Sequence, residues 1–272
     1  MALPVVQPTG RRVVAVMLNN TLERLRAMKM SAFADELERQ MEDANSYGQL
    51  GFEDRLSLLV DSEWNRRQDN KFVRFIRNAH FSDASATMEG IEYIEDRHLD
   101  KGKMLRFATC RYVDEGRHII LKGASGNGKT YIACALGNAA CRKFKTVRYI
   151  RMPELLDELS IAKANGEFGK VIKAYKKVDL LILDEWLIRC LVPEETYAML
   201  ELIEIRTRHG ATIFCTQFET EGWYSRIDPD PESGSPICEA IMDRVTHNAY
   251  NILVDGEKSM RERYGLKAEE LE

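Results

Sequence analysis

The sequence predicts an α/β protein built on a parallel sheet, and three stretches carry the prediction. Gly123-Ala-Ser-Gly-Asn-Gly-Lys-Thr130 matches the phosphate-binding pattern G-x-x-x-x-G-K-[ST]. Apolar residues 118–121 precede it like a short strand, and apolar residues 131–136 follow it like the start of a buried helix. The stretches 178–185 and 211–217 each read as a buried strand that ends in polar residues.

The remaining elements of this sheet follow from apolar patterning. Short strands are expected at residues 147–150 and 251–254, which are mostly apolar. Helices are expected from Pro153, which suits a first helical turn, and over residues 193–209 and 237–245. Strands that alternate with helices in this way favour parallel pairing with helices on the faces.

The glycine-rich stretch has the residue types that a phosphate site needs. Its glycines let the backbone curl so that several N–H groups point inward, and the following helix adds partial positive charge. Lys129 is expected to reach the β- and γ-phosphates, and Thr130 to offer its hydroxyl to Mg²⁺. The expected nucleotide contacts are Gly123, Ala124, Ser125, Gly126, Asn127, Gly128, Lys129, Thr130 and Tyr131.

Two carboxylates follow the four consecutive apolar residues 180–183. Ligands of open α/β sheets bind at the carboxyl ends of the strands, so both side chains are expected near the phosphates. We predict that Asp184 coordinates Mg²⁺ and that Glu185 is the general base that activates water. Thr216 and Gln217, at the end of the next strand, are expected to face the γ-phosphate.

Composition restricts the protein class. The chain has 272 residues, of which 44% are hydrophobic and 30% charged, as in globular proteins. Its net charge of −4 means that nucleic acid would have to bind a local basic patch. The 6 cysteines form no C-x-x-C pair, so neither a metal cluster nor a disulfide framework is expected. The apolar run 13–18 is too short for a signal peptide or membrane span, so we expect a cytoplasmic protein without a membrane partner.

Four regions are expected along the chain. Residues 1–15 read as a disordered arm and 16–110 as a small all-helical N-terminal domain that includes a long helix from Phe52 to Ala79. Residues 111–256 form the predicted nucleotide domain, with the boundary near Arg111, and residues 257–272 form a charged tail. A break between helices is expected at residues 45–48.

Two basic helix faces are candidate DNA-binding surfaces. Cations at helical spacing can track phosphates, although a run of charges is more often a solvated helix face. The candidates are Arg66, Arg67, Lys71, Arg74 and Arg77 on the long helix, and Lys170, Lys173 and Lys177 on a later short helix.

These motifs, in this order and spacing, resemble an AAA+ ATPase. More narrowly, the chain is similar to the IstB-type transposition helpers, which are relatives of the DnaC and DnaI helicase loaders. The narrower marks are Glu63-Trp-Asn-Arg-Arg67, Ala240-Ile-Met-Asp-Arg-Val-Thr-His247 and Gly256-Glu-Lys-Ser-Met-Arg261. The resemblance implies a three-layer αβα fold. It departs from many such chains in having Asp184-Glu185-Trp186 and in having too few residues after Val254 for a C-terminal lid domain.

The resemblance also implies a function. Such proteins use ATP and Mg²⁺ to self-assemble, as a ring or helical filament, on duplex DNA, and they recruit and stimulate the transposase of the same insertion sequence. ATP would be hydrolysed between subunits, with Arg244 as the arginine finger that reaches the neighbouring γ-phosphate. Surface pairing of Arg244 with Asp243 or Glu239 is the alternative, and the other finger candidates are Arg206, Arg208 and Arg261. Thr216 would sense the γ-phosphate, with Gln217 as the alternate.

Two other functions remain open at this point. A helicase loader would bind single-stranded DNA and a replicative helicase. Some loaders carry an N-terminal zinc cluster, and this chain has no cysteine before Cys110. A small-molecule kinase would use the same phosphate loop but would need a lid and an acceptor pocket, for which the sequence gives no sign.

Overall fold

The computed structural model describes residues 19–228 and 236–264, so the predicted disordered arm and the end of the charged tail lie outside it. The chain divides into two compact units between Lys71 and Phe72. This division differs from the predicted boundary near Arg111, because residues 72–110 contribute to the core of the second unit through Ala79, Met104 and Phe107. No helix in the described ranges is long and apolar enough to cross a membrane.

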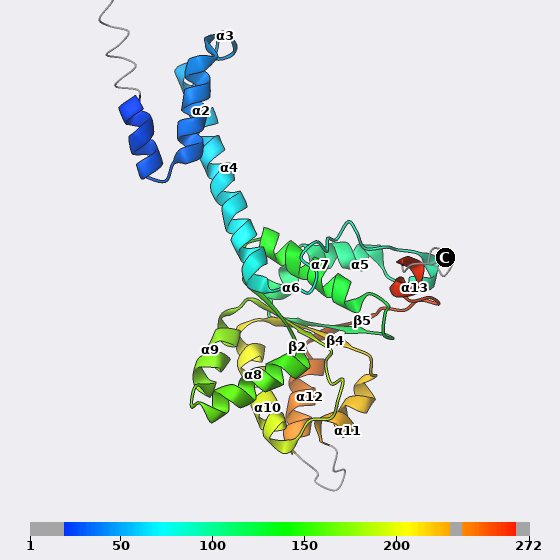
Figure 1. The fold of residues 1–272 in the computed structure, drawn as a ribbon. Helices are drawn as coiled ribbons and strands as arrows, with labels where there is room; N and C mark the ends of the chain where they lie inside the picture. Colours follow the sequence, from blue (N-terminus) through cyan, green and yellow to red (C-terminus); the bar gives the residue numbers. More distant parts are fainter. Residues whose placement is uncertain (1–18, 229–235, 265–272) are drawn as a thin grey trace, which may run out of the picture. The chain divides into compact units, whose positions relative to one another are not determined.

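The second unit contains a five-stranded parallel sheet (Figure 1), as the sequence predicts. Its strands are β1 (His118–Lys122), β2 (Val147–Arg151), β3 (Leu180–Asp184), β4 (Ala211–Thr216) and β5 (Ala249–Leu253). Their order in the sheet is β2-β3-β4-β1-β5. The central position of β1, β3 and β4 brings the phosphate loop and both predicted polar strand ends to one edge of the sheet.

Helices cover both faces of this sheet and make the three-layer fold (Figure 1). Alternate strand residues point to opposite faces, so Ile119 and Leu121 pack on one side and Ile120 on the other. The first face carries α5 (Lys101–Ala108), α6 (Arg111–Asp114) and α7 (Lys129–Arg142). The second carries α8 (Met152–Ala164), α9 (Phe168–Lys177), α10 (Pro193–His209) and α12 (Pro236–Thr246).

Four short helices complete the second unit. They are η1 (Glu95–Arg97), η2 (Thr220–Trp223), α11 (Tyr224–Ile227) and α13 (Met260–Tyr264). The described start of the charged tail is therefore partly helical.

The first unit is helical, as predicted. Residues 19–27 are helical and are followed by α2 (Ser31–Glu42) and α3 (Ala44–Tyr47), before α4 (Phe52–Ala79) begins. The bounds of α4 are those predicted from its pattern. The expected break at residues 45–48 is instead the one-turn helix α3, which forms because Asp43 accepts the Ser46 N–H at 3.1 Å.

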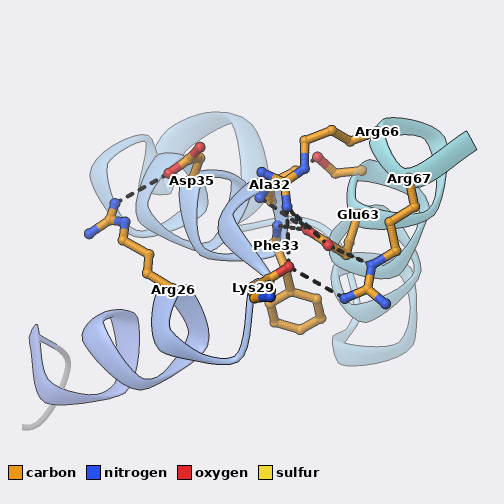
Figure 2. A network of polar contacts seen from close by, with 9 residues as sticks. Arg26, Lys29, Ala32, Phe33, Asp35, Glu63, Arg66 and Arg67 are labelled. Atoms are coloured by element: carbon orange, nitrogen blue, oxygen red, sulfur yellow. Dashed lines mark hydrogen bonds and ion pairs between the residues drawn. The ribbon is translucent and has the colours of Figure 1, made fainter. Parts of the chain in front are cut away.

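A buried carboxylate holds this unit together (Figure 2). Glu63 of α4 is 5% exposed and accepts the N–H groups of Ala32 and Phe33 at 3.1 and 3.3 Å. It thereby caps the N-terminus of α2, where the residue before the helix supplies no side-chain cap. Arg66 and Arg67 pair with the same carboxylate at 2.9 and 2.8 Å.

The ion pairs set the charge of Glu63. Burial alone would raise its pKa, but hydrogen bonds from Arg67, Arg66 and the Phe33 amide outweigh burial and hold the pKa below its usual value. The segment Glu63 to Arg67, which is part of the family resemblance, therefore helps to hold the first unit together. Its two arginines, predicted as DNA contacts, have a structural role that needs no DNA.

Candidate functional site

The phosphate loop joins β1 to α7 and is fixed by neighbouring backbone. The Gly123 N–H donates to the Thr216 carbonyl at 3.2 Å, which ties the loop to the end of β4. A Cβ at Gly123 would lie 2.0 Å from the Val254 carbonyl oxygen, so only glycine fits there. Gly128 has a φ of +87°, which favours glycine just before the helix begins. Tyr131, also a predicted nucleotide contact, accepts the Thr87 N–H at 3.4 Å.

Lys129 lies folded over this loop. It is 8% exposed, and its Nζ donates to the carbonyls of Gly123 and Ala124 at 2.8 and 2.7 Å. Burial lowers its pKa from the ordinary lysine value. Phosphate oxygens would compete with these carbonyls for the same ammonium, which is the role that the sequence predicts.

Asp184 lies beside the loop at the end of β3. Its Oδ2 accepts the Thr130 hydroxyl at 2.7 Å and the Tyr149 hydroxyl at 2.8 Å, and its Oδ1 accepts the Glu185 N–H at 2.9 Å. The two predicted metal ligands, far apart in sequence, therefore come together. Burial is the main cause that raises the pKa of Tyr149, followed by the charge of Asp184, so the phenol stays a donor.

This donor set fits Mg²⁺ better than a transition metal. Within residues 19–228 and 236–264, no group of three or more His, Cys, Asp or Glu side chains could hold a metal. One hydroxyl and one carboxylate remain, both beside a phosphate loop. Mg²⁺ commonly takes one or two protein oxygens and completes its shell with phosphates and water. Thr130 and Asp184 are thus the residues that would hold it.

Glu185 stands at the open side of the site. Its backbone has a φ of +55°, and its side chain is 40% exposed with its Oε1 4.0 Å from Arg151 Nη1. The turn is fixed by the Trp186 N–H, which donates to the Cys215 carbonyl at 2.8 Å. Trp186, which differs from the residue that many similar chains have here, is buried against Phe214 with ring centroids 4.8 Å apart. Its side chain therefore fills part of the core. Glu185 remains accessible to water, as a general base requires.

Thr216 is buried at the end of β4. Its hydroxyl accepts the Phe218 N–H at 3.1 Å, while its carbonyl holds Gly123. Gln217 is exposed. The strand end is therefore next to the phosphate loop through its backbone, and the choice of Thr216 or Gln217 as sensor stays a prediction.

Of the arginine candidates, Arg206 is structural, and its prediction as an alternative finger was wrong. It is 0% exposed and donates to the carbonyls of Tyr175 at 3.1 Å, Asp179 at 3.3 Å, Val178 and Ala211. Burial lowers its pKa to about 10. A guanidinium enclosed in this way cannot reach another subunit.

The other candidates lie nearer the surface. Arg208 pairs with Glu204 at 3.0 Å across one helical turn. Arg244 is half-buried and donates to the Ala240 carbonyl of its own helix at 2.8 Å. The side chain of Arg261 lies outside the described part of the protein. The assignment of Arg244 as the finger stays a prediction.

The predicted DNA-binding lysines and arginines of the second unit are exposed. Lys173 and Lys177 lie on α9, and Lys170 of the same helix pairs with Glu167 at 3.1 Å. Arg74 and Arg77 are exposed on α4. Lys71, in the first unit, is also exposed. Their role stays a prediction.

Two residues that support the site were not predicted from the sequence. One is Tyr149, which donates to Asp184, and the other is Arg97, which contacts the phosphate loop. Arg97 is 3% exposed, and its Nη2 donates to the Asn127 carbonyl at 2.8 Å. Burial lowers its pKa. The Met260 N–H, at the start of α13, donates to the Gly126 carbonyl at 2.9 Å. Only the resemblance mark Gly256 to Arg261 pointed to this segment.

The segment 256–264 is also held by contacts with residues 92–97. Asp96 of η1 pairs with Arg263 and accepts the Glu257 N–H at 3.1 Å, and Tyr264 donates to Glu92. Residues 92–97 and 256–264 thus brace the back of the phosphate loop.

Comparison with known proteins agrees with this geometry. The family described as IstB-like ATP binding protein matches residues 21–268. The chain is 31% identical over 242 residues to y4pL of Sinorhizobium fredii, which is named as an insertion-sequence ATP-binding protein, with 89% of this chain and 96% of that protein covered. It is 35% identical over 202 residues to the ATP-binding protein named for insertion sequence IS1162 of Pseudomonas fluorescens, with 74% and 87% covered.

Solved structures agree on the fold. DnaI superposes with a TM-score of 0.53 at 23% identity and covers 65% of this chain and 91% of its own. AMPPCP-bound DnaA from Aquifex aeolicus superposes with a TM-score of 0.54 at 16% identity, over 70% and 59%. These likenesses show the AAA+ fold. The family match over most of the chain, together with the relative at 31% identity, establishes that this protein belongs to the IstB-like ATP-binding proteins of insertion sequences.

Proposed function

We propose that this protein is an ATP-dependent regulator of transposition that assembles on duplex DNA and recruits and stimulates a transposase of the same insertion sequence. The observation that carries the proposal is the 2.7 Å hydrogen bond between Thr130 and Asp184 beside the phosphate loop. It supports the proposal because it brings the two residues proposed to hold Mg²⁺ together in a chain whose relatives are named for insertion sequences.

The chemistry follows from the placement of the side chains. Phosphates would draw Lys129 away from the loop carbonyls, and Thr130 and Asp184 would hold Mg²⁺. Glu185, exposed at the mouth, would orient and deprotonate the attacking water. Bound Mg²⁺ supplies charge neutralisation at the β- and γ-phosphates.

Completion of the site by a second subunit is the regulatory step. Arg206 is excluded as a finger by its burial, whereas Arg244 lies half-buried on α12 and donates to the Ala240 carbonyl of its own helix. Arginine fits phosphate oxygens through its planar fork and stays charged. We propose that Arg244 enters the site of a neighbouring copy, so that hydrolysis follows assembly.

A helicase loader is the second candidate function. It is favoured by the superposition on DnaI and on the DnaC helicase loader, of which 97% is covered at a TM-score of 0.52. At 18% identity to DnaC, that likeness concerns the fold. The two functions differ in the DNA form that should stimulate the ATPase.

The test is the ATPase rate with duplex, single-stranded or no DNA, each at a fixed Mg²⁺ concentration. Stimulation of the ATPase by duplex DNA supports the transposition regulator. Transposase that is then added should be retained on the ATP-bound protein–DNA complex. Stimulation by single strands alone would favour the loader. A chain that binds ATP but responds to neither DNA would overturn both functions.

A further inference from the structure

A pocket outside the phosphate site combines aromatic rings with cations. It lies between α5, α6 and β5 of the second unit and has a volume of about 490 Å³. Its lining includes the aromatic residues Phe107, Tyr112 and Tyr250 and the cations Lys103, Arg106 and Arg111. The pocket shares no residue with the phosphate loop, Asp184 or Glu185. We call it the basic aromatic pocket.

Its rings pack against one another. The centroids of Phe107 and Tyr250 are 5.2 Å apart, and those of Phe107 and Tyr112 are 5.9 Å apart with an edge-to-face angle of 88°. Tyr250 projects from the edge strand β5 and is 36% exposed. The Tyr250 ring is therefore partly accessible to a planar ligand beside Arg117, which lies over it.

One buried polar group of this wall has no partner. Tyr112 is 3% exposed, and its hydroxyl makes no hydrogen bond within the described residues. A buried hydroxyl without a partner is costly for the fold. Because this hydroxyl is enclosed in the protein, Tyr112 contributes its ring to the pocket rather than a hydrogen bond to a ligand.

The charge around the pocket is positive, although the whole chain has a net charge of −4. Glu115 is the one carboxylate among the lining residues, and it pairs with Arg117 at 3.2 Å and with Arg111 at 4.0 Å. Arg117 also lies over the Tyr250 ring, 5.7 Å from its centroid. Asp100 is a further nearby acid, but it caps α5 by accepting the Lys103 N–H at 3.0 Å.

We propose that the basic aromatic pocket binds one unstacked nucleotide of a DNA strand, with its base against Tyr250 and its flanking phosphates on Lys103 and Arg106. Cations alone would serve a paired duplex, whose bases are hidden in the stack. A recessed aromatic wall suits a base that has left the stack. An acidic protein segment would match the cations but would not need the ring of Tyr250.

This inference rests on the proposed function, because it assumes that the assembled protein holds DNA. It adds the form of DNA that is held, namely one with an unpaired or flipped base. Helix α5 carries two of the three cations that line the pocket, Lys103 and Arg106.

The test compares two fluorescent duplexes that differ by one unpaired nucleotide, using the full chain with ATP and Mg²⁺ and measuring anisotropy over a series of salt concentrations. The wild type should bind the duplex with the unpaired nucleotide roughly tenfold more tightly, the size of one base–aromatic stack. Tyr250→Leu should abolish that preference while keeping the affinity for the perfect duplex. The ATPase rate without DNA should not change.

A charge variant separates the phosphate contacts. Lys103→Gln with Arg106→Gln should weaken binding of both duplexes and make the salt dependence shallower by about 2 in log–log slope, at roughly one ion per phosphate. Lys143→Gln with Lys163→Gln removes the same charge from exposed positions that do not line the pocket. This control should leave the salt dependence at its wild-type slope.

The outcomes distinguish the two levels of proposal. Equal affinity of the wild type for both duplexes, or a preference that survives Tyr250→Leu, would overturn the pocket assignment and leave the proposed function intact. A wild type that binds neither duplex would overturn the proposed function as well. If Tyr250→Leu binds DNA normally but loses stimulation of the transposase, the pocket serves a protein partner and the nucleotide assignment is wrong.

Discussion

Tyr149→Phe tests how the protein holds its metal-binding carboxylate. The substitution removes only the hydroxyl that donates to Asp184 Oδ2 at 2.8 Å and keeps the buried ring. A hydrogen bond to a charged group contributes about 1.5–3 kcal/mol. Loss of a group that orients a metal ligand typically costs about 10–100-fold in metal affinity or activity. We therefore expect the Mg²⁺ concentration for half-maximal ATPase to rise at least roughly tenfold.

The assay is a Mg²⁺ titration of the ATPase rate, together with binding of a fluorescent ATP analogue without metal. Nucleotide binding without Mg²⁺ should be unchanged, because Tyr149 makes no contact with the phosphate loop among the described hydrogen bonds. Tyr175→Phe is the matched control, since it removes a tyrosine hydroxyl from another carboxylate, Glu158. If Tyr149→Phe has the wild-type Mg²⁺ dependence, or if both variants shift it equally, the positioning role is refuted.

Four further predictions concern the supports of the fold and site. Glu63→Gln should lower the free energy of unfolding by about 2 kcal/mol in a urea titration, because a charged cap and two ion pairs are lost. Because the pKa of Glu63 is below its usual value, the ionised carboxylate stabilises the fold above the unfolded pKa, and this contribution is lost as the pH falls through the folded pKa. The difference in unfolding free energy between wild type and Glu63→Gln should therefore shrink in acid. A difference that does not change with pH would contradict this. Arg206→Met should lower the free energy of unfolding by about 3 kcal/mol, because it leaves buried carbonyls without a donor. Arg244→Ala should keep wild-type stability and ATP binding but lose the ATPase activity of the assembly. Arg97→Leu should weaken ATP binding roughly tenfold in titration calorimetry, because the Asn127 carbonyl loses its buried donor. An unchanged affinity would show that the phosphate loop keeps its conformation without Arg97.

Much of the second unit could be predicted from local patterns. The five strands and the helix Pro193–His209 each have an apolar pattern that sets their position within a few residues. The phosphate loop and Asp184 were predicted because their spacing in the sequence reflects a strand–loop–helix order. The meeting of Thr130 with Asp184 then follows from parallel pairing.

What could not be predicted depends on tertiary contacts between distant segments. Tyr149 reaches Asp184 because β2 pairs with β3 in the register that puts Ile150 opposite Leu183. Arg206 looks like any helical arginine, and only the surrounding carbonyls make it structural. Arg66 and Arg67 formed a basic face in the sequence, but the buried Glu63 that binds them depends on the docking of α2.

The central claim is that ATP drives assembly of this protein on duplex DNA, and light scattering of Glu185→Gln tests it most directly. The amide cannot deprotonate water but leaves Lys129, Thr130 and Asp184 in place. With ATP and duplex DNA, the variant should form large particles that persist, whereas Lys129→Ala should form none. Particles of equal size with ATP and ADP, or equal assembly by Lys129→Ala, would contradict the account.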